Sequence, residues 1–250
     1  MAELLLDKVT IEFPLLHVGH RSLKKTLVAR ATGGIVLKEA NTPTVVRALS
    51  EISVHLRSGD RVGIVGPNGS GKTTLLCTLA GIYEPVTGLM RTTGDVATLL
   101  DIAGGMRPEL TGIENIQLRS MLMGLTNRQI RAIMPEVEEF TELGDFLNMP
   151  IRTYSSGMRV RLAFALATAV KADILLMDEW VLAGDAGFSA KATERLESMV
   201  TGANILVLAS HNNDIIRKWC NKALYLRHGK LQMYGDVNEV VDAYMNDARS

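Results

Sequence analysis

One glycine-rich stretch constrains the fold of this chain more than any other feature. It follows the apolar run 61–65, which reads as a strand, and it leads into the apolar run 72–80, which reads as a helix. The stretch fits the pattern G-x-x-x-x-G-K-[ST] and consists of Gly66, Pro67, Asn68, Gly69, Ser70, Gly71, Lys72, Thr73 and Thr74. A strand, a glycine-rich turn and a helix in this order predict a phosphate-binding loop.

The residue types of this loop suit a nucleoside triphosphate. Glycines let backbone N–H groups turn inward as an anion-binding nest, and the following helix adds the positive end of its dipole. We expect Lys72 to reach the β- and γ-phosphates, Thr73 to supply one Mg²⁺ ligand and Thr74 to contact a phosphate. Kinases, GTPases and helicases share such a loop, so the loop by itself does not select a family.

A second stretch places two acids at the end of an apolar strand. Residues 174–177 are apolar and lead into Asp178 and Glu179. The carboxyl ends of parallel strands meet the phosphate loop at one edge of a sheet, so both carboxylates should lie beside it. We expect Asp178 to hold Mg²⁺, mostly through water, and Glu179 to polarise the water that attacks the γ-phosphate. The alternative for these acids is an ordinary capped helix start.

A third stretch, residues 154–158, precedes a helix predicted over 159–170 and reads Tyr-Ser-Ser-Gly-Met. Here the chain resembles the ABC ATPase family, whose signature motif is usually Leu-Ser-Gly-Gly-Gln and lies one helix before the acidic strand end. The resemblance implies that three residues bind the γ-phosphate held by a second copy of the chain: Ser155, Ser156 and Gly157. Read alone, Ser155 is also an ordinary helix N-cap.

The resemblance assigns further positions. Asp185 resembles the D-loop aspartate of the family, and His211 resembles the switch histidine that senses the terminal phosphate. No glutamine stands between residues 98 and 108, where most members place a Mg²⁺-binding glutamine, and Asp101 is the expected metal ligand in its place. Phe13 is expected to stack on the adenine, although a core or surface position would also explain an aromatic there.

The apolar rhythm and the resemblance together predict the fold class. We expect an α/β protein with a P-loop NTPase (RecA-like) core of the ABC type, an antiparallel β subdomain and a small helical subdomain. All of 1–250 should form one nucleotide-binding domain, with 1–100 and 165–250 as core plus β subdomain and about 105–164 as helical subdomain with the signature motif. Strands are expected over 4–13, 48–56, 61–65, 174–177 and 205–209, and later helices over 190–199 and 237–244. Helical spacing predicts inward-facing residues Leu118, Met121, Leu122, Ile130, Ile133, Val137 and Phe140.

Composition excludes several classes of protein. Lysine plus arginine equals aspartate plus glutamate at 27 each, so no global field would gather nucleic acid, and we expect no nucleic-acid partner. The N-terminus does not read as a signal peptide, and no apolar run approaches the roughly 20 residues that cross a bilayer. Cys77 and Cys220 lack metal-ligand spacing and are expected to be buried thiols. We therefore expect a peripheral protein, held at the cytoplasmic face of the inner membrane through a partner.

Several segments resemble, within the ABC family, the ATPase subunits that export O-antigen, capsule or teichoic acid. They are residues 81–85, 109–115, 142–145, 154–164, 178–180 and 183–185. The resemblance implies ATP and Mg²⁺ as cofactors, a transmembrane permease subunit and a second copy of the chain as partners, and a lipid-linked polysaccharide as the cargo of the permease. The chain stops soon after Tyr244, as in members of the short type without a C-terminal carbohydrate-binding domain.

Two alternatives stay open beside this interpretation. An importer or drug-exporter subunit would use the same chemistry on a different cargo, and an ABC ATPase of translation or DNA repair would bind nucleic acid. Tandem motors or long coiled-coil insertions, which mark those last classes by resemblance, are not evident in the sequence. The long segment 14–44 is expected to be a lid over the nucleotide or a contact with the membrane partner.

Overall fold

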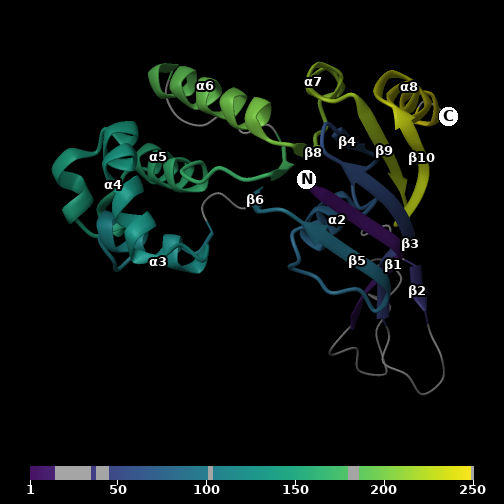
Figure 1. Ribbon diagram of the computed structural model, residues 1–250, viewed down its shortest axis with the longest axis horizontal. Helices are drawn as coiled ribbons and strands as arrows, with labels where there is room; N and C mark the ends of the chain where they lie inside the picture. Colours follow the sequence, from purple (N-terminus) through teal and green to yellow (C-terminus); the bar gives the residue numbers. More distant parts are fainter. Residues whose placement is uncertain (15–34, 38–44, 101–103, 180–185, 249–250) are drawn as a thin grey trace, which may run out of the picture. The chain divides into compact units, whose positions relative to one another are not determined.

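The computed structural model describes residues 1–14, 35–37, 45–100, 104–179 and 186–248. The chain divides into two compact units, each drawn with its elements labelled in Figure 1. The first, here called the sheet unit, consists of residues 1–100, 172–180 and 203–250. The second, here called the helical unit, consists of residues 101–171 and 181–202.

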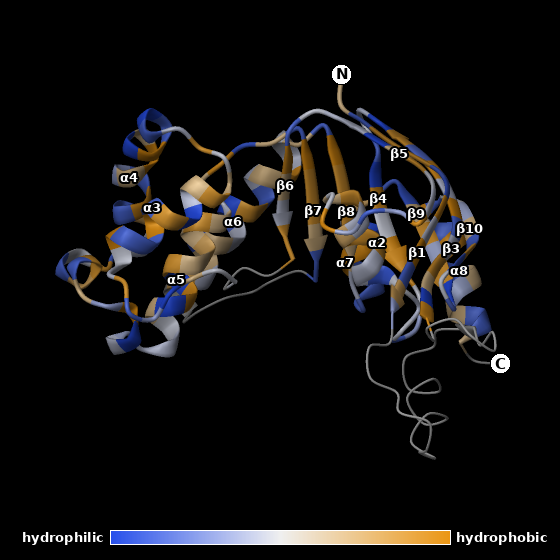
Figure 2. Cartoon of the chain, turned by 90° about the horizontal axis from the view of Figure 1, so that it is seen from below, coloured by the Kyte–Doolittle hydropathy of each residue, from blue (hydrophilic) through white to orange (hydrophobic). Residues whose placement is uncertain are grey.

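The sheet unit is built on a sheet with the strand order β10-β9-β4-β8-β7-β6. Its strands are β4 (Arg61–Val65), β6 (Val96–Leu99), β7 (Ile174–Asp178), β8 (Ile205–Ala209), β9 (Lys222–Arg227) and β10 (Lys230–Asp236). All neighbours pair in parallel except β9 and β10, which form an antiparallel hairpin. Strand β8 is buried along its whole length, and Figure 2 shows β7 and β8 as largely apolar strands. Continuous burial of this kind belongs to parallel strands that are covered on both faces.

A second, antiparallel sheet of the same unit has the order β2-β3-β1-β5. Its strands are β1 (Glu3–Pro14), β2 (Ile35–Leu37), β3 (Val45–Arg57) and β5 (Thr87–Thr93). The expected strands 4–13 and 48–56 are confirmed within β1 and β3. The pairing of these two strands shifts register beside Lys8 (φ 48°), so the chain takes a left-handed residue where the ladder bulges.

Among the described residues, the helices of the sheet unit are α2 (Lys72–Leu79), α7 (Asn213–Trp219) and α8 (Val237–Asp247). Helix α2 joins the two sheets, because Leu75, Leu76 and Leu79 are buried in one core with strands of both. Cys220, at the end of α7, is buried as expected, whereas Cys77 on α2 is partly exposed. Across the described ranges, no helix combines the length and apolar character that a membrane span requires.

The helical unit contains α3 (Gly112–Leu122), α4 (Asn127–Thr141), α5 (Ser156–Ala167), α6 (Ala186–Gly202) and the 3-10 turns η1 (Gly144–Asn148) and η2 (Ile151–Thr153). Helices α3 and α4 both start at capping boxes, Thr111 with Glu114 and Thr126 with Gln129. The core of the unit is apolar and includes an aromatic cluster, in which Phe164 lies 6.0 Å from Phe140 and 6.1 Å from Phe188 between ring centroids.

Two of the expected inward-facing residues of the helical unit are wrong. Met121 and Leu122 are 53% and 71% exposed. The buried stripe of α3 contains Ile116 and Ser120, and each helical residue turns by about 100°, so Met121 and Leu122 lie off this stripe. The buried positions of Ile130 and Val137 are confirmed, and Leu118, Ile133 and Phe140 are partly buried.

Candidate functional site

The phosphate loop lies between β4 and α2 and needs its glycines for steric reasons. Gly66, Gly69 and Gly71 have φ of 149°, 77° and 105°, a region that favours glycine. A Cβ on Gly66 would overlap the carbonyl oxygen of Leu226 on β9, and one on Gly71 would crowd the side chain of Leu49 on β3. The loop is therefore held between strands of both sheets, in a backbone conformation that turns its N–H groups inward.

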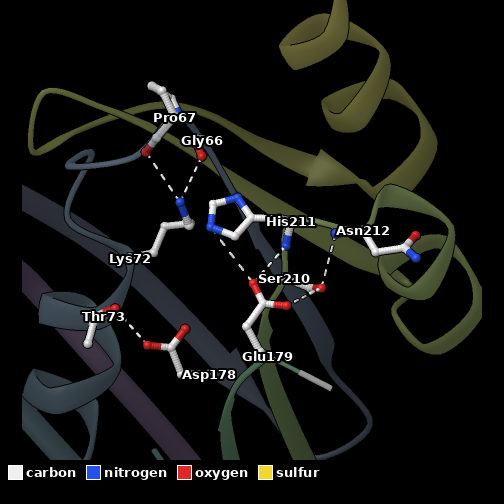
Figure 3. A network of polar contacts seen from close by, with 9 residues as sticks. All are labelled: Gly66, Pro67, Lys72, Thr73, Asp178, Glu179, Ser210, His211 and Asn212. Atoms are coloured by element: carbon white, nitrogen blue, oxygen red, sulfur yellow. Dashed lines mark hydrogen bonds and ion pairs between the residues drawn. The ribbon is translucent and has the colours of Figure 1, made fainter. Parts of the chain in front are cut away.

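Lys72 is the cation of this loop. Its ammonium donates to the carbonyl oxygen of Gly66 at 2.8 Å and of Pro67 at 3.2 Å, so the side chain curls back over the loop, as Figure 3 shows. Burial lowers the pKa of Lys72, and the nearby carboxylates of Asp178 and Glu179 partly oppose this shift. The arrangement places a positive charge over a nest that favours phosphate.

Thr73 and Asp178 form a pair of oxygen ligands beside the loop. The Thr73 hydroxyl donates to Asp178 Oδ2 at 2.6 Å, which joins the first turn of α2 to the end of β7. A hydroxyl and a carboxylate are the hard oxygen donors that Mg²⁺ takes in phosphate-loop sites. The two residues therefore fit the metal role that the sequence predicts for them.

Glu179 is held more tightly than a surface acid. Its backbone is in the left-handed region, with φ 73°, and its N–H donates to the carbonyl oxygen of Ala209 at 2.8 Å. The carboxylate accepts the Ser210 hydroxyl at 3.0 Å on Oε2 and the backbone N–H of His211 at 3.0 Å on Oε1. The imidazole Nε2 of His211 lies 3.8 Å from the same Oε1. The structure thus brings Glu179 and His211 together, as Figure 3 shows.

Ser210 is a member of this group that the motifs do not reveal. Ser210 follows β8 and is 3% exposed. Its hydroxyl oxygen also accepts a hydrogen bond from the backbone N–H of Asn212 at 3.1 Å. Serine directly before the candidate switch histidine is the only sequence signal for it. A hollow of about 780 Å³ opens next to this group and is lined by Glu179, His211, Asn212, Asn213, Asp214, Arg217, Asp242 and Met245.

The remaining loop residues and Phe13 have plainer surroundings. Thr74 is partly buried in the first turn of α2, and Ser70 is 2% exposed with no hydrogen-bond partner for its hydroxyl among the described residues. Phe13 is half-buried near the end of β1, where its ring meets Tyr83 edge-on with centroids 5.0 Å apart. One side of this ring is therefore occupied by protein, and its contact with adenine stays a prediction.

The signature residues belong to the helical unit. Ser155 is the N-cap of α5, and its hydroxyl accepts the backbone N–H of Met158 at 3.2 Å. Ser155 and Ser156 are exposed, and Gly157 is half-buried. The N-cap geometry is the plain alternative that the sequence left open, and it coexists with an exposed helix start able to receive an anion. Asp101 and Asp185 lie outside the described residues, as does most of segment 14–44.

The fold and the site define a phosphate-loop nucleotide-binding cassette. The ABC transporter family profile matches residues 49–182, more than half of the chain. The chain belongs to the ABC transporter family and is an ATP-hydrolysing cassette of this family. The expected fold class and the resemblance to this family are therefore confirmed.

Relatives within the family are similar over most of this chain. The O-antigen export system ATP-binding protein RfbE of Yersinia enterocolitica is 44% identical over 229 residues, which cover 92% of this chain and 96% of the relative. The RfbB protein of Myxococcus xanthus, with the same description, is 38% identical, covering 83% of this chain and 47% of its own length. The teichoic acids export ATP-binding protein TagH of Bacillus anthracis is 40% identical over a match that covers 79% of this chain and 36% of the relative.

Solved structures support the fold. A dimeric ATP-binding cassette in a post-hydrolysis state, bound to ADP and Pi, matches with a TM-score of 0.64 and 21% identity, covering 94% of this chain and 98% of that one. An ATP-binding subunit of an ABC transporter matches with a TM-score of 0.68 and 19% identity, covering 99% of both chains. At these identities the likeness concerns the fold alone.

Proposed function

We propose that this chain powers the export of a lipid-linked surface polysaccharide, such as O-antigen, through a separate permease subunit. The observation that carries the proposal is the 44% identity to an O-antigen export ATP-binding protein across nearly the full length of both chains. The teichoic acids export ATP-binding protein, at 40% identity, supports surface polymers as the wider class of cargo. In this reading the chain supplies energy and the permease selects the cargo.

The residues of the sheet unit divide the chemical work. The backbone of residues 66–71 and the ammonium of Lys72 bind the phosphates of ATP, while Thr73 and Asp178 hold Mg²⁺, with Asp101 as a further ligand. When bound, Mg²⁺ neutralises charge on the phosphate oxygens. Glu179 accepts a hydrogen bond from the attacking water and takes its proton as the water oxygen bonds to the γ-phosphorus. ADP leaves with the electrons of the broken P–O bond.

The helical unit contributes through a second copy of the chain. Two copies would face each other so that the start of α5 in one, with Ser155, Ser156 and Gly157, closes on the γ-phosphate held by the other. Asp185 would take the role of the D-loop aspartate, and His211 would hold the terminal phosphate. A cassette of the same fold has been solved as a dimer bound to ADP and Pi, which is the assembly that this proposal requires of the present chain. Closure and reopening of the pair would then drive the permease.

The cellular location of the chain would follow from its attachment to the permease. The pair of motors would sit at the cytoplasmic face of the cytoplasmic membrane, attached through the permease and without nucleic acid. Adenine would stack on Phe13, and the whole chain would form a single nucleotide-binding domain.

A Glu179→Gln variant, expressed with its permease, tests the proposal. We expect ATP turnover to fall by at least about 100-fold, because the general base is lost, while Mg-ATP binding persists and traps a dimer. Glu84→Gln, at an exposed acid in the loop between α2 and β5, is the matched control and should keep parental turnover.

The cell-level readout completes this test. A strain that carries only the Glu179→Gln variant should accumulate lipid-linked polysaccharide on the inner side of the membrane and lose surface glycan. Parental turnover in the variant would refute the assignment of the base. Lost turnover with normal surface glycan would refute the cargo.

A further inference from the structure

The hydroxyl of Ser210 is the one buried side-chain donor that reaches the Glu179 carboxylate among the described residues. Ser210 stands at the end of β8, and Glu179 stands at the end of the neighbouring strand β7, where Asp178 pairs with Ala209. The contact joins Ser210 Oγ to Glu179 Oε2 at 3.0 Å, and Ser210 is 3% exposed. A hydrogen bond that a hydroxyl donates to an ionised carboxylate is stronger than a hydrogen bond between two neutral groups.

The Ser210 hydroxyl donates in this hydrogen bond, because the carboxylate can only accept. The Ser210 oxygen accepts the backbone N–H of Asn212 at 3.1 Å, and that N–H can only donate. A serine hydroxyl has one hydrogen, so this hydrogen is free for the carboxylate. Ser210 therefore links the turn that begins α7 to the acid on β7, as the dashed lines in Figure 3 show.

The backbone of Glu179 needs such support. A residue other than glycine at φ 73° costs roughly 1–3 kcal/mol and persists where its surroundings over-determine it. Here the carboxylate is held on both oxygens by adjacent residues, through the hydroxyl of Ser210 and the N–H of His211. Each oxygen keeps a further acceptor site, which leaves the carboxylate able to receive a water molecule.

We propose that Ser210 is a positioning residue for the hydrolysis reaction, which aligns the Glu179 carboxylate on the attacking water. The inference rests on the proposed role of Glu179 as general base. Ser210 touches neither phosphate nor water in this proposal, and it acts only by holding the acid in its orientation. Hydrogen-bond partners of metal-ligating residues commonly contribute about 10–100-fold to metal affinity or activity, and we expect an effect of similar size for the partner of a catalytic carboxylate.

Ser210→Ala and Ser210→Thr in the full chain test the proposal. We expect Ser210→Ala to lower kcat by about 10–100-fold and to leave the Kd of Mg-ATP within about twofold, because the phosphate loop is untouched. Ser210→Thr keeps the hydroxyl and should restore most of kcat. Ser120→Ala is the matched control, since Ser120 is also buried, 1% exposed, but its hydroxyl has no partner among the described residues.

The double variant with Glu179→Gln separates this inference from the proposed function. Residues that act as one unit are not additive, so adding Ser210→Ala to Glu179→Gln should lower the residual turnover by less than about twofold. Parental kcat in Ser210→Ala beside inactive Glu179→Gln would overturn the role of Ser210 and leave the proposed function standing. The role of Ser210 would also be overturned if Ser210→Ala lowered the turnover of the Glu179→Gln variant by the same factor as it lowers that of the parent. The same holds if Ser210→Thr kept parental thermal stability but did not restore kcat. Parental turnover in Glu179→Gln would instead overturn the base assignment itself.

Discussion

The sheet unit and the helical unit place their candidate functional residues in opposite ways. In the sheet unit these side chains bond to one another, as Thr73 does to Asp178 and Ser210 does to Glu179. In the helical unit, as far as the structure describes it, the hydroxyl of Ser155 accepts a hydrogen bond from the start of its own helix and from no other residue. The first unit therefore presents an assembled group of residues, whereas the second presents an exposed helix start.

This difference teaches how the two units depend on partners. Parallel strands deliver their carboxyl ends to one edge, so the groups at the ends of β7 and β8 meet within a single copy. A helix start has free N–H groups but no converging neighbours, so it needs an anion brought from elsewhere. Within the helical unit, capping boxes and an aromatic cluster stabilise the helices.

The largest expected effect concerns the core of the helical unit. Phe164 is fully buried and contacts the rings of both Phe140 and Phe188. Phe164→Ala should lower the free energy of unfolding of this unit by about 3–5 kcal/mol, because a buried ring leaves a cavity. Hydrogen exchange should show α4 and α5 opening far more often while β4 and β8 keep their protection. Equal loosening of both units would show that the two do not unfold independently.

A second prediction concerns the start of α5. Ser155→Asp keeps an N-cap acceptor but places a negative charge where the proposed phosphate of the second copy arrives. Stability should stay near the parental value, and ATP turnover should fall by about 100-fold. Thr126→Ala, which removes the comparable cap of α4, is the control: it should cost about 1 kcal/mol of stability and leave turnover unchanged. Parental turnover in Ser155→Asp would confine Ser155 to its capping role.

The smallest expected effect is an alkaline loss of stability that comes from a buried cysteine of the sheet unit, which holds both cysteines of the chain. Burial raises the pKa of Cys220 from its ordinary 9.0 to about 12. The native state favours the protonated thiol, so its stabilisation is complete below pH 9 and is lost as pH rises towards 12. In that window the free energy of unfolding should fall by about 1.4 kcal/mol per pH unit from this group.

Urea unfolding at pH 8 and pH 10 measures this slope. Cys220→Ala should flatten the difference between the two pH values, relative to the parent. Cys77→Ala is the matched control and should flatten it less, because Cys77 is partly exposed and its pKa is raised by a smaller amount. An unchanged slope in Cys220→Ala would contradict the burial effect.

The sequence by itself determined the local chemistry of this protein. Residues 66–74, the acids at 178 and 179 and the fold class were predictable, because a strand, a glycine turn and a helix encode their conformation in neighbouring residues. Strand β5 was not predictable in this way, since it is mostly exposed and carries Thr and Gly in place of an apolar alternation. Its place in the sheet comes from pairing with β1.

Only the tertiary structure decided which residues support those motifs. The contact between Ser210 and Glu179 joins positions 31 residues apart, because β7 and β8 are neighbours in the sheet although a whole helix separates them in the chain. The positive φ of Glu179 and the exposure of Met121 arise in the same way, from what each element packs against. Motifs depend on neighbours along the chain, whereas orientation and burial depend on neighbours in space, and these are set by how the strands and helices assemble.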